Sequence, residues 1–112
     1  MKVGIYCIWD RRTSWMTPTF DMNDASATRN FEAALFHEDS LFNTHYQDFA
    51  LYRLGSFDSD TGLIAAFEEP SFLIDGEAAL GYRVKRDLDS GAHRSEELKR
   101  EKGDHVEYGY RR

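Results

Sequence analysis

A group of basic residues near an aromatic ring marks the N-terminal third of the chain. Lys2, Arg11, Arg12 and Arg29 all occur by position 29, and Trp15 lies among them. Guanidinium groups beside a ring are the combination that clamps a phosphate and stacks on an unpaired base. These five residues are therefore a candidate site for single-stranded nucleic acid. The alternative is that the ring belongs to the core and the cations to a solvated surface.

The charge balance favours that alternative over most of the chain. Residues 1–82 carry five basic and thirteen acidic side chains, a difference of −8, and residues 83–112 carry nine and seven, a difference of +2; together they give −6. A net negative body repels a phosphate backbone at long range. Contact with nucleic acid would need a local patch, or the basic run Arg83-Val84-Lys85-Arg86. A solvated acidic surface that keeps the protein soluble is the simpler interpretation.

The spacing of Asp58, Asp60 and Gly62 matches a fragment of a calcium-binding loop. A full loop requires more oxygen ligands, a later bidentate Glu and flanking helices. Here the flanking residues have the alternation of strands, so a hairpin turn is the better interpretation. No metal or other cofactor is predicted.

The remaining reactive side chains do not form a catalytic pattern. The chain has four histidines, none of them paired at metal-binding spacing, at positions 37, 45, 93 and 105. Cys7 lies within an apolar strand, which is typical of a buried and inert thiol. Neighbouring acids such as Glu68 and Glu69 point to opposite sides of a strand, and no phosphate-binding loop or serine nucleophile motif occurs. We therefore expect that the protein is not an enzyme.

The residues that must position these side chains indicate an α+β fold. Lys2–Trp9 is predicted as a strand with apolar residues on both faces, and so as a central strand covered on both sides or by a partner. Residues 11–19 are polar, contain Pro18 and are predicted as a loop. Asn23 or Asp24 should cap a helix, since either side chain can accept from free amides of the first turn. Its apolar stripe is Ala27, Phe31, Ala34 and Leu35.

The second half of the body has the pattern of a β-hairpin. Residues 50–57 and 63–67 alternate like strands around an Asp-rich turn in which Gly62 can adopt the left-handed conformation. Residues 39–48 are predicted as short helical turns, and residues 71–74 as a further short strand. The expected fold is a small antiparallel or mixed sheet with one main helix packed on it. Because such a sheet keeps one face open, a homodimer is predicted.

One domain is expected from a chain of 112 residues and 13.0 kDa. We place it at residues 1–82 and predict a charged tail over residues 83–112, disordered or partly helical. No apolar run is long enough to span a bilayer, and the short apolar start lacks a signal-peptide cleavage site. The chain is therefore predicted to be soluble and intracellular, without membrane contact.

Three segments of the body resemble one protein family. They are MKVGIYCIWD at the start, NDASATRNFE through DSLFNTHYQDF, and LYRLGSFDSDTGLI. In this order they resemble the small nonstructural protein of gokushoviruses, tailless single-stranded DNA phages of the Microviridae. The resemblance covers about the first two-thirds of the chain and does not extend over the charged last third.

The resemblance implies a non-enzymatic accessory role in viral single-stranded DNA synthesis or packaging, in the cytoplasm of the host. It implies binding to a phage replication or procapsid protein and to single-stranded DNA, and it brings no catalytic residue. A second hypothesis is a host-directed interaction protein whose acidic surface blocks a host nucleic-acid enzyme. The first hypothesis predicts salt-sensitive DNA binding or capture of a phage protein. The second predicts capture of a host protein and indifference to DNA.

Overall fold

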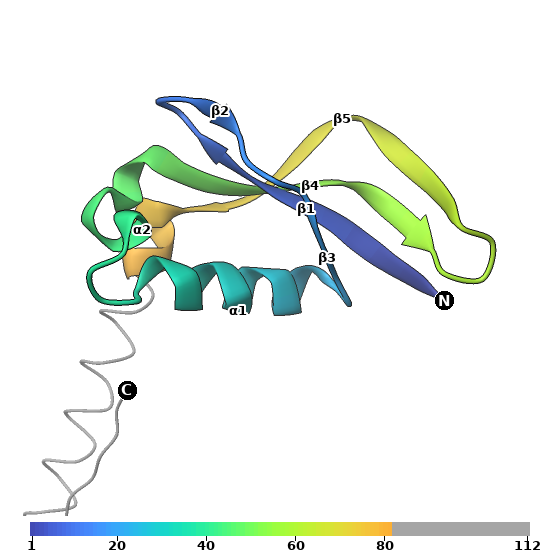
Figure 1. Ribbon diagram of the computed structural model, residues 1–112, viewed down its shortest axis with the longest axis horizontal. Coiled ribbons are helices and arrows are strands. Elements are labelled where there is room, and N and C mark those ends of the chain that lie inside the picture. The colour runs from blue at the N-terminus through green and yellow to red at the C-terminus, as the bar shows by residue number, and fades with distance from the viewer. Residues whose placement is uncertain (82–112) are drawn as a thin grey trace, which may run out of the picture. The chain divides into compact units, whose positions relative to one another are not determined.

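The computed structural model describes residues 1–81, which form a five-stranded antiparallel sheet and short helices. Figure 1 shows α1 lying along one face of this sheet, with α2 near one end. Residues 76–81 are helical at the end of the described range. The elements in chain order are β1 (Lys2–Asp10), β2 (Ser14–Trp15), β3 (Thr19–Asp21), α1 (Asp24–Leu35), α2 (Leu41–Thr44), the 3-10 helix η1 (Tyr46–Asp48), β4 (Phe49–Asp58) and β5 (Leu63–Asp75).

The sheet is built around β1, as the sequence predicted. Its order is β2–β1–β4–β5, and β3 pairs with β1 as well. The prediction that residues 11–19 form a loop is wrong, because β2 and β3 fall within or overlap them. Strands of two and three residues are too short to show a hydrophobic period. They are ordered by hydrogen bonding to β1, while Pro18, which has no amide donor, lies between them.

The helix α1 begins where the sequence indicated. Asn23 is its N-cap, and its side-chain oxygen accepts a 2.8 Å hydrogen bond from the Ser26 amide. Of the predicted stripe, Ala27, Phe31 and Leu35 are buried and Ala34 is half-buried. The same core contains Tyr6 from β1, Phe49 and Leu51 from β4, Ile74 from β5 and Ala79. The α+β fold with a main helix on one face of the sheet is confirmed.

A polar contact joins the first turn of α1 to the sheet. The Tyr6 hydroxyl donates a 2.7 Å hydrogen bond to Asp24 Oδ1, which also accepts a 3.0 Å bond from Arg53 Nη1. The Arg53 guanidinium lies 5.7 Å from the centre of the Tyr6 ring. Burial and the bond to Asp24 raise the pKa of Tyr6 to about 12, so its hydroxyl remains a donor at neutral pH. Asp24 therefore fixes the helix on the sheet, while Asn23 provides the cap.

The predicted hairpin is present and longer than expected. Gly62 has φ of 78° in the turn, the left-handed conformation that the sequence required of it. Residues 71–74 are not a separate strand, because β5 continues to Asp75 and pairs again with β4. Between these paired regions the register shifts, and residues 67–70 bulge out opposite Leu54. Pro70 lies in the bulge, where its missing amide costs no ladder bond.

The first test of this core is Phe31→Ala. Phe31 is 3% exposed between α1 and the sheet, so its truncation leaves a cavity and should lower the free energy of unfolding by about 3–5 kcal/mol. Urea denaturation followed by circular dichroism measures this loss. Arg29→Ala, on the exposed side of the same helix, should stay within about 0.5 kcal/mol. Equal midpoints for the two variants would contradict the packing described.

The second test concerns Gly4, which lies beside the Tyr6 side chain. A Cβ at Gly4 would lie closer than 3.0 Å to the Tyr6 ring and hydroxyl, nearer than real Cβ atoms come. Gly4→Ala should therefore displace Tyr6 and cost about 1–3 kcal/mol. Gly81→Ala is the control, because nothing lies within 4 Å of the added methyl. Thermal unfolding compares them, and a Gly4→Ala variant as stable as the control would refute this placement of Tyr6.

Candidate interaction surface

The face of the sheet opposite α1 can be followed from the strand register. Tyr6 and Ile8 pack toward α1, so the alternate residues of β1 point the other way. Register partners in an antiparallel pair point to the same side. We call the resulting set the open face: Val3, Ile5, Cys7, Trp9, Trp15, Phe20, Ala50, Tyr52, Gly55, Phe57, Ile64, Ala66, Phe72 and Asp75.

Two aromatic pairs reach across β1 on the open face. The rings of Trp15 and Tyr52 meet edge to face with centroids 5.1 Å apart, and those of Phe20 and Phe57 lie 5.5 Å apart. In each pair one ring comes from β2 or β3 and the other from β4. The two middle open-face side chains of β1 are buried in consequence, with Ile5 7% and Cys7 2% exposed, whereas Trp9 is 36% exposed. The chain itself thus covers much of the second apolar face of its central strand.

Cys7 lies under the first of these pairs. Its thiol donates a 2.9 Å hydrogen bond to the carbonyl of Met16, next to Trp15. Burial raises the pKa of Cys7, and the hydrogen bonds to backbone carbonyls only partly offset this effect. The predicted burial of this thiol is confirmed. A protonated, covered sulfur of this kind is a poor nucleophile.

The aromatic covering is itself well exposed. Phe72 adds a third ring to the first pair, 5.6 Å from Tyr52, and is 55% exposed, while Phe20 is 58% and Ile64 63% exposed. With about half of some 200 Å² exposed on each large side chain, the face presents on the order of 500 Å² of apolar surface. A patch of that size is at the upper end of what monomers show and is typical of interaction sites.

The open face has one charged residue, Asp75 at its margin. The Asp75 carboxylate accepts a 2.8 Å hydrogen bond from the Ala78 amide, so it serves to cap the helical residues that follow. Arg53, the basic residue of β4, points to the α1 side. Its guanidinium contacts Asp24 and lies 5.6 Å from the Phe67 ring centre. The open face is therefore apolar across all five strands.

The structure brings together three of the five predicted nucleic-acid contacts. Arg11 and Arg12 lie in the exposed turn between β1 and β2, and Trp15 follows three residues after Arg12, at the end of β2. Their Nε atoms are 3.6 and 3.7 Å from the two carboxylate oxygens of Asp48. The Arg11 amide also donates a 2.9 Å bond to the Asp48 carbonyl, which fixes the turn against η1.

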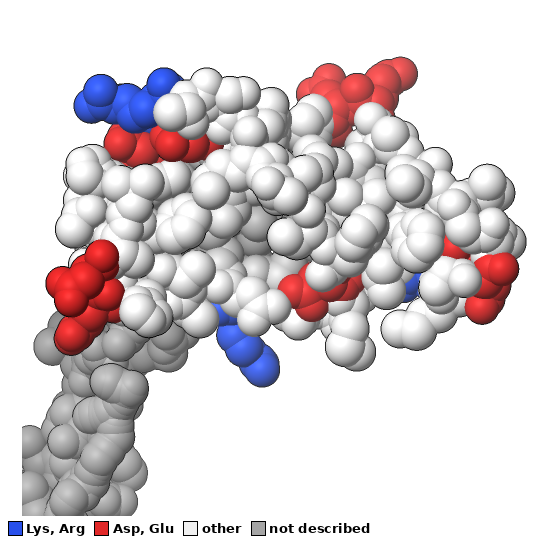
Figure 2. Space-filling view, in the orientation of Figure 1, with Lys and Arg blue, Asp and Glu red and all other residues white. Residues whose placement is uncertain are grey.

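Lys2 and Arg29 lie elsewhere. Lys2 is at the opposite end of β1, about 30 Å along the strand from Arg11. Its backbone lies opposite that of Asp58 in the pairing of β1 with β4. Arg29 is exposed on α1, which packs on the other face of the sheet. Figure 2 shows basic side chains as separate spots with acidic side chains nearby, and no continuous basic patch on the face in view. The predicted five-residue site is thus reduced to the β1–β2 turn.

The aromatic residues of β4 and β5 were missed as candidates from the sequence. Tyr52, Phe57 and Phe72 lie in strands whose two register shifts with each other break the simple alternation. Two of these rings meet Trp15 and Phe20 only because β2 and β3 pair with β1. The signal that could have found them is the excess of aromatic residues, 14% of the chain.

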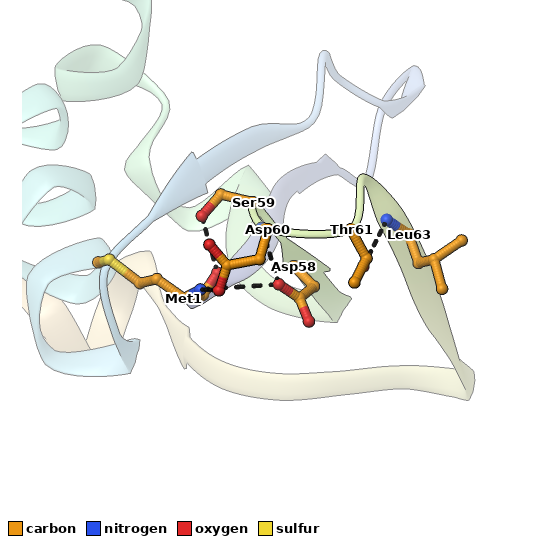
Figure 3. A network of polar contacts seen from close by, with 6 residues as sticks. All are labelled: Met1, Asp58, Ser59, Asp60, Thr61 and Leu63. Atoms are coloured by element: carbon orange, nitrogen blue, oxygen red, sulfur yellow. Dashed lines mark hydrogen bonds and ion pairs between the residues drawn. The ribbon is translucent and has the colours of Figure 1, made fainter.

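The Asp-rich turn forms a closed set of polar contacts, shown in Figure 3. Asp58 Oδ1 accepts a 2.9 Å bond from the Asp60 amide, which lowers the pKa of the Asp58 carboxyl below its ordinary 3.8. The Met1 amino group lies 2.5 Å from Asp60 Oδ2 and 3.6 Å from Asp58 Oδ1. The Ser59 amide donates to the Met1 carbonyl at 2.9 Å. The Asp58 and Asp60 carboxylates therefore hold the start of β1 against the hairpin turn.

Two further properties hold for residues 1–81. None of their His, Cys, Asp and Glu side chains gather in a group of three or more that could hold a metal ion. None of their helices has the length and apolar character needed to cross a bilayer.

The fold and its open face define a small α+β protein with a surface suited to binding. The family of the Phage ORF5 protein matches residues 3–79, so this chain belongs to that family of phage proteins. No curated protein and no solved structure matches the chain. The predicted phage origin is confirmed at the level of this family.

Labelling of Cys7 tests the covering of β1. In the native protein a thiol reagent at pH 8 should react at least about tenfold more slowly than in urea, because the thiol is buried and its pKa raised. Trp15→Ala should restore much of the rate by opening one side of the cover. Met22→Ala, at an exposed residue before α1, is the control and should leave the rate unchanged.

Absorbance at 412 nm with Ellman's reagent reports the kinetics. Fast labelling of the native wild-type protein would disprove the covering.

Proposed function

We propose that this phage protein is a non-enzymatic accessory of viral single-stranded DNA synthesis or packaging, acting in the host cytoplasm. It binds single-stranded DNA through the turn between β1 and β2 and the neighbouring Trp15, and it acts together with a phage replication or procapsid protein. The observation that carries the DNA contact is that Arg11 and Arg12 lie in an exposed turn and that Trp15, in the strand β2 that follows it, is exposed as well. Membership of a phage protein family supports the viral setting.

The turn has the properties of a phosphate contact. The Arg11 and Arg12 side chains are 60% and 76% exposed, and their distances to Asp48 are longer than a tight hydrogen bond. A phosphate can therefore approach both guanidinium groups from solvent. The backbone beneath them is fixed, because Asp10 accepts from the Arg12 amide at 3.0 Å and from the Thr13 hydroxyl at 3.1 Å.

Single strands should be preferred over duplex. Trp15 is 43% exposed next to these cations, and a ring can stack only on an unpaired base. Residues 1–81 carry five basic and thirteen acidic side chains, a difference of −8, which repels the denser charge of a duplex more strongly. Two cations on such a body support weak binding, consistent with an accessory protein that is held in place by a protein partner.

The non-enzymatic character is supported by where the reactive groups lie. Cys7 is buried and protonated, and Tyr6 is buried against Asp24. The Asp58 and Asp60 carboxylates are engaged in the hairpin turn. Catalysis requires a nucleophile and a base that can both reach a substrate. The Cys7 thiol and the Tyr6 hydroxyl are buried, and the exposed Asp60 carboxylate is paired with the Met1 amino group.

A second function is favoured by the acidic character of the body. With a charge difference of −8 over residues 1–81, the surface could occupy a basic site on a host nucleic-acid enzyme. This host-directed protein would bind its target through carboxylates and ignore DNA.

Fluorescence anisotropy at low salt tests the DNA contact. The full chain should bind a labelled single strand at tens of micromolar protein and weaken as salt is raised. For two phosphate contacts, the slope of log K against log salt is about −1.4. Arg11→Glu with Arg12→Glu should abolish binding.

The matched control is Lys2→Glu with Arg29→Glu, which changes the net charge by the same amount at sites away from the turn. It should retain most of the affinity. Equal losses in both double variants would show that only net charge matters. Absence of any signal from the wild-type protein would leave the host-directed function, which capture of a host enzyme from infected cells would then support.

A further inference from the structure

The open face differs sharply in charge from the rest of the body. Residues 1–81 carry eighteen charged side chains, five basic and thirteen acidic. The register places only Asp75 of these on the open face, and that carboxylate is bound to the Ala78 amide. A face whose one charged residue is a carboxylate at its margin, on a strongly charged body, is suited to contact with another apolar surface and not with a phosphate backbone.

The relief of the face follows from its residue sizes. One row of large side chains runs through Trp15, Tyr52 and Phe72, and a second through Phe20, Phe57 and Ile64. On β4 and β5 the register places Gly55 opposite Ala66 between the rows, where no side chain is larger than a methyl, while the same line continues through Ile5 and Phe20 on β1 and β3. Two ridges separated by a low strip can fit an inverted copy of themselves, with a ridge of one face lying in the strip of the other.

The open edge of the sheet, strand β5, is poorly suited to pairing with a second chain. At residues 67–70 the pairing of β5 with β4 is interrupted by the bulge, which contains Glu68, Glu69 and Pro70. A bulge, charges and a proline are the features that prevent edge-to-edge pairing of strands. Association through the face of the sheet is therefore favoured over extension of the sheet.

We propose that a second copy of this chain packs on the open face, forming a two-fold dimer through the two aromatic rows. The exposed apolar area of the open face is large enough for an interface between two copies. About 500 Å² from each copy gives on the order of 1,000 Å² in total, the lower limit for a specific interface. A two-fold axis makes the same face complementary to itself and closes the assembly at two copies. The acidic side chains then stay on the outer surfaces.

Other occupants fit the face less well. Residues 82–112 of the same chain carry nine basic and seven acidic side chains in 31 residues, and such a segment cannot cover an apolar face without burying charge. Single-stranded DNA would need cations on the face, whereas Arg53 points to the α1 side and Arg11 and Arg12 lie outside the face. The dimer rests on both aromatic rows and not on the arginines of the proposed DNA contact, with which it shares the single residue Trp15.

Two neighbouring residues of β5 provide a matched test. Ile64 is 63% exposed on the open face, and Leu63 is 69% exposed on the opposite face. Ile64→Lys places a charge in the interface and should weaken dimerisation at least about tenfold, an effect of about 1.4 kcal/mol. Leu63→Lys makes the same change without entering the interface and should leave dimerisation unaltered. Phe72→Lys, in the other aromatic row, should act like Ile64→Lys.

Sedimentation velocity on the full chain measures the effect over a range of concentrations. The wild-type protein should approach twice its 13.0 kDa monomer mass. Its dimer should become tighter with added salt, because salt screens the repulsion between two bodies of charge −6. DNA binding has the opposite salt dependence, so failure of one proposal is distinguishable from failure of the other. A monomer at high micromolar concentration, or equal weakening by Leu63→Lys and Ile64→Lys, would overturn the inference.

Discussion

The structure depends on covering both faces of β1, a central strand that is apolar on each side. On one face the cover is α1, fixed by the Tyr6 hydroxyl and Arg53 through their shared acceptor Asp24. Tyr6 is 1% exposed, so this hydrogen bond is formed where an unpaired hydroxyl would be costly. Gly4 leaves the space that the Tyr6 ring occupies. The position of the helix on the sheet thus follows from one tyrosine and its two polar partners.

The second face of β1 is covered by side chains instead of a helix. Rings from β2 and β3 meet rings from β4 above the strand, which explains why two strands of two and three residues persist in the fold. This arrangement buries Ile5 and Cys7 but exposes the outer surfaces of the rings. The body is thereby left with an aromatic face whose one charged residue, Asp75, lies at the margin. The rings that complete the core over β1 therefore also form the open face, the surface most suited to a partner.

The described part of the chain offers two surfaces suited to contact with a partner, the open face and the β1–β2 turn. The five basic side chains of residues 1–81 are dispersed: one pair in the β1–β2 turn, one at the start of β1, one on α1, and Arg53 bound to Asp24. Arg53 lies over the exposed Phe67 ring but is engaged by Asp24, whereas the pair in the turn is followed by the exposed Trp15. A contact of two cations on an acidic body cannot be strong by itself. A dimer through the open face would cover the Trp15 ring and place two Arg11–Arg12 pairs on one particle, and a second phosphate contact raises overall binding without any new residue.

The sequence by itself determined the elements with strong local signals. The cap and apolar stripe of α1, the central place of β1 and the hairpin with Gly62 in its turn all follow from side-chain spacing and local backbone preference. The short strands β2 and β3 and the continuation of β5 past Pro70 did not, because they are ordered by backbone pairing with distant strands. For the same reason only the tertiary structure decided the candidate surfaces. Register placed Tyr52, Phe57 and Phe72 beside Trp15 and Phe20, and it separated Lys2 and Arg29 from Arg11 and Arg12.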